Sequence, residues 1–376
     1  MQFIDLHKQY DRIKEDVQKS MEQVYRHKRF IMGEEVCELE SRLQEYTKVK
    51  HVITCASGTD ALTIPLMAKN LTRKNAVFVP SFTFFASAES ITLAGGTPVF
   101  VDSEWDTFNM DPVDLEKKIL STQQTTDLEP SGVIAVDLFG LPADHKEICK
   151  VADKYNLFVL EDAAQGFGGN IEGKKAASFG NIAATSFFPA KPLGCYGDGG
   201  AIFTDDDQLA DLIRSIHIHG QGVDKYDNVR IGLNSRLDTM QAVILLAKLK
   251  IFDEELERRN EVADLYSQQL EDLLEIPIVP NGYHSSWAQY TVKAENQDQR
   301  DTIVKALKSQ DIPVMIYYSV PAHKSTAYSK KIKVENDNLR ICERLSSTVF
   351  SLPMHPYLEK HEITKICDAV KKSIKA

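Results

Sequence analysis

The 376-residue sequence predicts an α/β protein with a mixed, mostly parallel central sheet, followed by a smaller α+β domain. Short apolar runs recur between residues 50 and 204, and amphipathic helical patterns separate several of them. Most runs lack alternation of apolar and polar residues, as expected of strands that helices cover on both faces. After residue 204 long helical patterns dominate. We therefore expect a large domain over residues 1–250, including an N-terminal helical segment, and a small domain over residues 251–376.

Seven apolar runs are the expected strands. They are Val52–Ala56, Ala76–Pro80, Pro98–Asp102, Val133–Leu138, Leu157–Asp162, Ala183–Phe188 and Ala201–Thr204. Helical patterns lie between several of them, at Asp60–Lys69, Ser87–Leu93, Pro112–Leu120 and Asp144–Tyr155. Such strand–helix–strand units form parallel sheets. The last runs are too close in sequence for a helix between each pair, so we expect a locally antiparallel or mixed edge.

The second half of the chain is expected to be mainly helical. Residues 205–219 and 237–273 have the patterns of long amphipathic helices, for example Asp238–Asp253 and Glu254–Leu274. A long helix is therefore expected to cross the domain boundary near residue 250. Further elements are expected as strands at Ile276–Val279, Trp287–Val292 and Val314–Tyr318, a helix at Gln299–Gln310, and C-terminal helices.

Composition excludes several classes of function. The chain has 44 Lys and Arg against 54 Asp and Glu, a net charge of −10, so we expect no nucleic-acid or anionic-membrane partner. Six scattered cysteines without a CxxC pair indicate reduced thiols. No apolar run approaches the roughly 20 residues that span a bilayer, and the N-terminus lacks a signal-peptide pattern. We expect a cytoplasmic protein.

The first polar strand end is Cys55-Ala56-Ser57-Gly58-Thr59-Asp60. A strand stops here and a helix begins, so free backbone N–H groups and the hydroxyls of Ser57 and Thr59 favour an anion. An ordinary N-cap of the helix is the alternative for this motif by itself.

The second polar strand end is Glu161-Asp162-Ala163-Ala164-Gln165. A carboxylate directly after a buried strand is costly to desolvate unless it meets a cation or several donors. A pyridinium nitrogen is such a cation, and a carboxylate beside it keeps the ring protonated. Capping of the next helix is the alternative.

The third polar strand end contains Lys191, between an apolar strand and a glycine-rich turn. Its amine is expected to point into an enclosed site, where burial lowers a lysine pKa and favours Schiff-base chemistry. A lysine that reaches solvent from a loop is the alternative.

Together these motifs resemble those of the DegT/DnrJ/EryC1/StrS sugar aminotransferases, which are fold-type I enzymes dependent on pyridoxal 5′-phosphate (PLP). Each motif alone is weak, but all of them in this order and spacing are specific. The matching segments are Phe30–Gly33, Ser57–Leu62, Leu138–Asp144, Glu161–Gln165, Ser186–Lys191 and Gly197–Gly200. The resemblance spans nearly the whole chain and implies an aspartate aminotransferase-like fold.

The resemblance implies a role for each cofactor residue. Lys191 would carry PLP as a Schiff base and move the proton between substrate and cofactor. Asp162 would pair with the pyridine nitrogen. Gln165, where other family members often have His, would lie near the phenolic oxygen. The remaining cofactor residues would be the phosphate-binding Gly58, Thr59 and Ser186 and the ring-stacking Phe84.

The resemblance also implies that two chains build each active site. Asn234 would reach the phosphate of the partner subunit's cofactor, which makes a homodimer obligatory; an ordinary turn residue is the alternative. The segment Val314–Pro321 resembles the aromatic stretch that meets the sugar. Tyr317 and Tyr318 are therefore expected to contact the substrate, and Arg236 an anionic substituent on it.

The reaction that the resemblance implies moves the amino group of L-glutamate to a nucleotide-linked keto sugar. The segment Phe188–Asp198 is most similar to enzymes acting on UDP-linked 2-acetamido-3-keto-glucuronate, for surface polysaccharide biosynthesis. Those enzymes often carry His-Tyr where this chain has Tyr317-Tyr318. That departure leaves open a neutral UDP- or dTDP-linked 3-keto or 4-keto sugar.

Other function classes fit the sequence less well. A nicotinamide-dependent oxidoreductase is disfavoured because no GxGxxG follows the first strand. The segment Gly168–Lys174 fits a P-loop until Lys175, and we expect a turn there. His217 and His219 diverge on a helix, so no metal site is expected. Retention of Lys191 disfavours a sugar dehydratase of the same family, and the complete set of cofactor residues disfavours a regulatory homologue.

Overall fold

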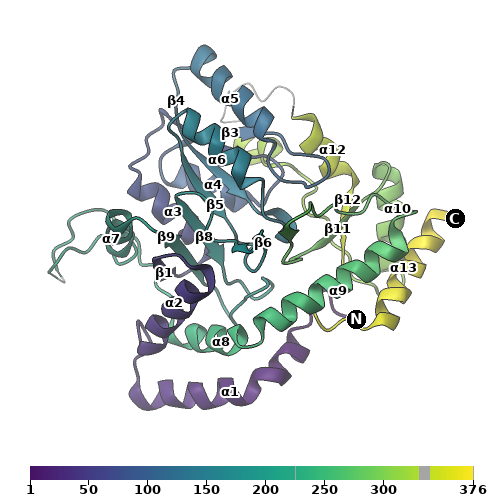
Figure 1. Ribbon diagram of the computed structural model, residues 1–376, viewed down its shortest axis with the longest axis horizontal. Helices are drawn as coiled ribbons and strands as arrows, with labels where there is room; N and C mark the ends of the chain where they lie inside the picture. Colours follow the sequence, from purple (N-terminus) through teal and green to yellow (C-terminus); the bar gives the residue numbers. More distant parts are fainter. Residues whose placement is uncertain (225, 330–338, 376) are drawn as a thin grey trace.

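The computed structural model describes residues 1–224, 226–329 and 339–375, and its centre is a seven-stranded sheet (Figure 1). The strand order is β1-β9-β8-β5-β4-β2-β3. Among these strands β9 alone runs antiparallel to its neighbours. The strands are β1 (His51–Cys55), β2 (Asn75–Pro80), β3 (Thr97–Val101), β4 (Glu129–Val136), β5 (Phe158–Asp162), β8 (Ile182–Ser186) and β9 (Gly200–Thr204). The predicted mostly parallel sheet with a mixed edge is confirmed.

Helices cover both faces of this sheet, because alternate strand residues point to opposite sides. Val77 and Val79 of β2 lie in one core cluster with Ile134 of β4, while Phe78 and Val133 lie in another. All five side chains are fully buried. The helices of this part are α3 (Gly58–Ala68), α4 (Phe85–Leu93), α5 (Pro112–Thr125), α6 (His145–Lys154) and α7 (Asp207–Ile216).

Capping side chains determine where several of these helices begin. The carboxylates of Asp111, Asp144 and Asp206 accept backbone N–H groups in the first turns of α5, α6 and α7. Pro112 occupies the first turn of α5, where its missing N–H costs no helical hydrogen bond. His217 is the C-terminal cap of α7 and is buried.

Further helices are α1 (Leu6–His27), α2 (Glu34–Thr47), α8 (Thr239–Leu249) and α9 (Phe252–Leu270). Helix α2 packs against β1 and α8, helix α1 packs on α8, and one predicted feature of this region is wrong. The break between the two expected helices lies at residues 250–251 and not at 253–254, so no helix crosses residue 250. Ile251 leaves the helical conformation and packs against the cluster of α1 and α8. It is α9 that connects the two halves, since its Phe252 packs in a core of the sheet and its Tyr266 in the C-terminal core.

The C-terminal part has its own core around a small antiparallel pair of strands. Its elements are β11 (Tyr290–Lys293), α10 (Gln297–Lys308), α12 (Arg340–Thr348), β12 (Val349–Leu352) and α13 (Lys360–Lys375). Two predicted strands are wrong. Residues 276–279 form none, because Pro277 lacks the N–H that a ladder needs. In Val314–Tyr318 only Met315 forms a bridge, with Ser351, before the chain turns away. The domain division near residue 250 stays a prediction.

Short elements complete the described fold. They are η1 (Leu138–Gly140), β6 (Asn170–Ile171), β7 (Lys174–Lys175), β10 (Tyr283–His284), η2 (Ala322–Lys324) and α11 (Thr326–Ser329). The turn expected within Gly168–Lys174 is the tight connection between β6 and β7, where Gly173 has a φ of +85°. All six cysteines are free thiols. No helix of the described residues is long and apolar enough to cross a membrane.

Candidate active site

A cavity of about 450 Å³ opens at the carboxyl edge of the parallel strands. Segments that follow β1, β2, β5 and β8 line it, as expected for a ligand site of an open α/β sheet. A hollow of about 660 Å³ lies at the opposite edge and contains none of the predicted site residues. The first cavity is therefore the candidate active site. Its polar lining is Ser57, Gly58, Thr59, Thr83, Ser87, Asp162, Gln165, Ser186, Lys191, Asp198, Gln289, Tyr317 and Tyr318.

The amino terminus of α3 forms one wall of the cavity and presents hydrogen-bond donors. Ser57 caps this helix by accepting the N–H of Asp60 at 3.1 Å. Gly58 and Thr59 are the first helical residues, and such N–H groups have no partner within their helix. A Cβ on Gly58 would lie 2.5 Å from the Cβ of Ser186, so only glycine allows this approach. The two segments form a cup suited to a phosphate.

Asp162 ends β5, and its carboxylate is buried in the cavity wall. Ser87 Oγ donates to Oδ2 at 2.7 Å, and the N–H of Ala164 donates to Oδ1 at 3.2 Å. Burial raises the pKa of Asp162, while these hydrogen bonds and the charge of Lys191 oppose the rise. The two hydrogen bonds hold the carboxylate in one orientation. A cation bound in the cavity would offset the free-energy cost of desolvating it.

Lys191 lies on the turn after β8, half-buried at the same cavity. Its backbone N–H donates to the carbonyl oxygen of Phe188 at 2.8 Å, which closes the turn. Burial lowers the pKa of Lys191, and the Asp162 carboxylate partly offsets this effect. A lowered pKa leaves more of the amine in its neutral, nucleophilic form. The cavity therefore holds an amine whose pKa is lowered by burial and a carboxylate whose pKa is raised by burial.

Gln165 links the end of β5 to the tyrosines of the C-terminal part. Its Oε1 accepts the N–H of Phe139 at 2.7 Å, and its Nε2 donates to Tyr318 Oη at 3.0 Å. Because the Phe139 N–H can only donate, the end of the Gln165 amide that faces it must be the oxygen. Because an amide nitrogen carries two hydrogens, Gln165 can also donate to an acceptor bound in the cavity. Burial raises the pKa of Tyr318, so its hydroxyl stays protonated.

Aromatic side chains border the cavity. Phe84, after β2, is 54% exposed, and its ring centroid lies 6.2 Å from that of Tyr318. The centroids of Tyr318 and Tyr317 are 5.7 Å apart. An exposed phenylalanine at a cavity offers an apolar face to a planar ligand.

Two predicted site residues lie outside the cavity lining. Asn234 is exposed and Arg236 is half-buried, and Arg236 Nη2 donates to Asn234 Oδ1 at 2.6 Å. Both belong to the segment between α7 and α8. Part of this segment projects from the rest of the chain beside α7 (Figure 1). Ser235 between them accepts the N–H of Ala56 at 3.1 Å and donates to Asp60 Oδ2 at 2.7 Å. Asn234 and Arg236 therefore lie next to a segment bound to the cavity wall without lining the cavity of their own chain.

Sequence reasoning missed four polar residues of the cavity: Thr83, Ser87, Asp198 and Gln289. Ser87 lies in a helical pattern, and nothing local indicates its bond to Asp162, 75 positions away. Gln289 is different, because it interrupts an apolar run. A polar residue in such a run is a signal that was available in the sequence.

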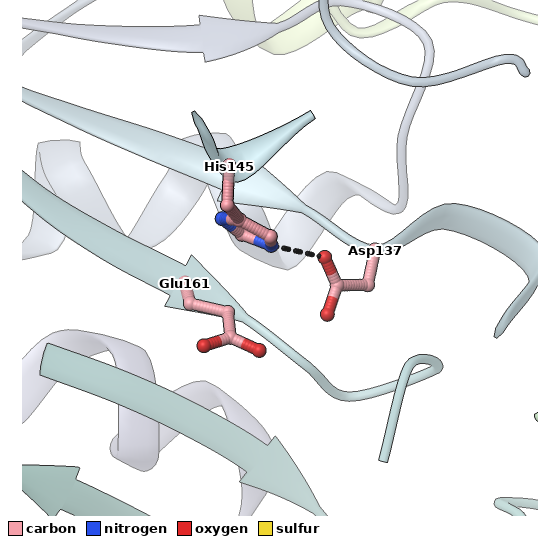
Figure 2. A group of neighbouring side chains, drawn as sticks. All are labelled: Asp137, His145 and Glu161. Carbon is pink, nitrogen blue, oxygen red and sulfur yellow. Dashed lines mark hydrogen bonds and ion pairs between the residues drawn. The ribbon is translucent and has the colours of Figure 1, made fainter. Parts of the chain in front are cut away.

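A second polar cluster is enclosed behind the cavity and joins Asp137, His145 and Glu161 (Figure 2). His145 Nε2 lies 2.7 Å from Asp137 Oδ1, and both Glu161 oxygens accept backbone N–H groups, those of Ala177 and Phe179. Burial and the charge of Asp137 raise the pKa of Glu161 well above its usual range. Within the described residues Asp137 Oδ2 has no donor.

Replacing Asp137 by asparagine is expected to flatten the pH dependence of stability. The pKa of Glu161 is raised in the folded state, so its contribution to the free energy of unfolding is fully present below its unfolded pKa of about 4.3. This contribution is lost as the pH rises through the pKa of the folded state. Asp137→Asn removes the like charge, so less stability is lost on going to neutral pH. Urea unfolding between pH 4.5 and 8 measures this. The exposed Asp127→Asn is the control, and equal slopes for Asp137→Asn and the wild type would contradict the interpretation.

Comparisons with known proteins identify the family of the chain. A model of the DegT/DnrJ/EryC1/StrS aminotransferase family matches residues 11–371. The UDP-2-acetamido-2-deoxy-3-oxo-D-glucuronate aminotransferase of Pseudomonas aeruginosa is 43% identical over 371 residues, 98% of this chain and 99% of that protein. The crystal structure of a DegT DnrJ EryC1 StrS aminotransferase from Brucella abortus has a TM-score of 0.96 and 48% identity, covering 99% of both chains. Bacillus subtilis NtdA with bound cofactor PMP has a TM-score of 0.89 and 28% identity, covering 100% of this chain and 83% of that one. The chain belongs to the DegT/DnrJ/EryC1/StrS aminotransferase family.

Proposed function

We propose that this aminotransferase uses PLP to move the amino group of L-glutamate to a nucleotide-linked keto sugar. The proposed acceptor is UDP-linked 2-acetamido-3-keto-glucuronate, aminated at C3 for surface polysaccharide biosynthesis. The observation that carries the proposal is the meeting of Lys191, Asp162 and the amino terminus of α3 in one cavity. The glucuronate follows from the 43% identical relative, whose name gives that substrate.

The residues present fit PLP group by group. The cup of Gly58, Thr59 and Ser186 offers donors and a helix amino terminus to the phosphate. Asp162, desolvated and held by two hydrogen bonds, suits a protonated pyridine nitrogen. The remaining partners would be Lys191 for the aldehyde carbon, Gln165 for the phenolic oxygen and Phe84 for the ring face.

PLP, when bound, supplies an electron sink for the electron pair that remains on the α-carbon of the amino acid when its proton is removed. The chain's own residues do the rest. Asp162 would keep a proton on the pyridine nitrogen, because a buried carboxylate beside that nitrogen favours its charged form. The lowered pKa of Lys191 suits an amine that takes a proton from one carbon and returns it to another. Enclosing walls keep bulk water from competing for that proton.

A homodimer with shared sites is part of the proposal. Asn234 is exposed on the segment between α7 and α8 and does not line its own cavity, which supports the proposal that it reaches a partner subunit's phosphate. The same segment exposes Val223, Val229 and Ile231, at 108%, 52% and 85%. Apolar side chains gathered on a projecting segment favour contact with another protein surface.

A panel of acceptors tests the proposed substrate. With ¹⁵N-glutamate as donor, kcat/KM for the UDP-linked 3-keto-glucuronate is expected to exceed that for its neutral counterpart by about tenfold or more, because a charge-assisted hydrogen bond adds this much. Arg236, which like Asn234 does not line its own cavity, is the residue proposed to meet the carboxylate of a sugar bound to the partner subunit. Mass spectrometry of the amino sugar gives the rates. Preference for the neutral sugar, or for a dTDP-linked 3-keto or 4-keto sugar, would replace the proposed acceptor.

A further inference from the structure

We infer that Ser81 and His323 are positioning residues that hold the substrate-facing tyrosines in place. Neither residue lines the cavity. They meet where residues 315–323, here called the tyrosine segment, pass the end of β2. The inference rests on the proposed function for its activity readout alone, because its structural readout needs no substrate.

The tyrosine segment is anchored at its two ends. Met315 exchanges two backbone hydrogen bonds with Ser351 of β12, at 3.2 and 2.8 Å. At the other end the N–H of Ala322 donates to the carbonyl oxygen of Ser81 at 2.8 Å. Residues 316–321 between these anchors contain no helix or strand. The positions of Tyr317 and Tyr318 therefore depend on both anchors.

The side chains of Ser81 and His323 add hydrogen bonds to the backbone bond of the second anchor. Ser81 Oγ lies 2.6 Å from His323 Nδ1 and accepts the His323 backbone N–H at 3.3 Å. His323 Nε2 lies 3.2 Å from Glu343 Oε1 on α12, and Lys324 pairs with the other oxygen at 2.7 Å. A neutral ring satisfies every contact, since Nε2–H donates to Glu343 and Nδ1 accepts the Ser81 hydroxyl. Burial lowers the pKa of His323, which favours this neutral form.

Ser81 belongs to the rigid part of the site. It is fully buried, and its N–H donates to the carbonyl oxygen of Val101 in β3 at 3.0 Å. Phe82, the next residue, packs edge-on against Tyr318 with centroids 6.2 Å apart. The Ser81–His323 bond thus ties the tyrosine segment to the sheet that positions the cavity.

Loss of this bond has a defined consequence. A freed segment must be ordered again when the sugar binds, and ordering costs binding free energy. The chemistry at Lys191 is untouched, so the KM for the sugar rises while kcat changes little.

Three variants of the holoenzyme test the inference. Ser81→Ala removes the hydroxyl. His323→Gln places its amide near Nε2 and loses the Ser81 bond, whereas His323→Asn places an amide oxygen near Nδ1 and can keep it. Expected is a KM for the keto sugar raised about tenfold in Ser81→Ala and His323→Gln, with kcat within about twofold. Hydrogen exchange of residues 316–321 should be faster in the same two variants. His323→Asn should match the wild type in both readouts.

Two results would overturn the inference. One is wild-type KM and wild-type exchange in Ser81→Ala. The other is a His323→Asn variant as impaired as His323→Gln, which would assign the effect to packing of the imidazole ring and not to its bond with Ser81. If the wild-type enzyme aminates no keto sugar, the proposed function fails, and the exchange measurement still decides the role of Ser81 and His323.

Discussion

Replacing Lys191 by alanine is expected to reduce transamination by at least about 10³-fold, because the variant loses both the nucleophilic amine and the proton carrier. The backbone hydrogen bond of Lys191 to Phe188 does not need the side chain, so the fold should persist. Activity with glutamate and keto sugar, together with the visible absorbance of the purified protein, measures the effect.

The control for this experiment is Lys117→Ala, an exposed lysine on α5. It should retain wild-type turnover and absorbance. Undiminished turnover in Lys191→Ala would show that another group does the chemistry, and the assignment of Lys191 would be wrong.

Replacing Asp162 by asparagine is expected to lower kcat/KM by about 10²–10³-fold, the size seen when a preorganised electrostatic contact is removed. Asparagine keeps the shape and can still accept from Ser87, but it lacks the charge that favours a protonated ring nitrogen. PLP binding, followed by absorbance titration, should weaken much less than the rate.

Ser87→Ala is the matched comparison, because it removes the hydrogen bond to Asp162 and leaves the charge. Its expected loss is about tenfold. If Ser87→Ala is as damaging as Asp162→Asn, orientation outweighs charge. A nearly active Asp162→Asn would contradict the proposed pairing with the ring nitrogen.

Much of the fold could be predicted because buried parallel strands have a strong local signature. All seven predicted runs of the first 204 residues overlap strands of the central sheet. The errors lie where pattern and tertiary packing disagree. Ile251 belongs to a helical pattern, yet it leaves the helical conformation and packs against the cluster of α1 and α8. Residues 276–279 are apolar without pairing to any strand, because Pro277 blocks a ladder.

Site residues could be predicted where they lie at or directly after the end of a strand. Gly58, Asp162 and Lys191 each follow or end a recognisable apolar run, and they line one cavity. Contacts between distant segments left no such signal. Ser87 meets Asp162 from a helix, and Ser81 meets His323 across 242 positions. Such pairs depend on how the elements pack, which a periodic pattern does not encode.

Lys191 is the residue proposed to carry PLP. Borohydride converts a carbon–nitrogen double bond between PLP and an amine into a stable link, so peptide mapping of the reduced holoenzyme by mass spectrometry locates the attachment. The expected result is one phosphopyridoxyl group per chain, on the peptide that contains Lys191. Its presence on a different lysine, or its absence from protein that has been saturated with PLP, would contradict the account.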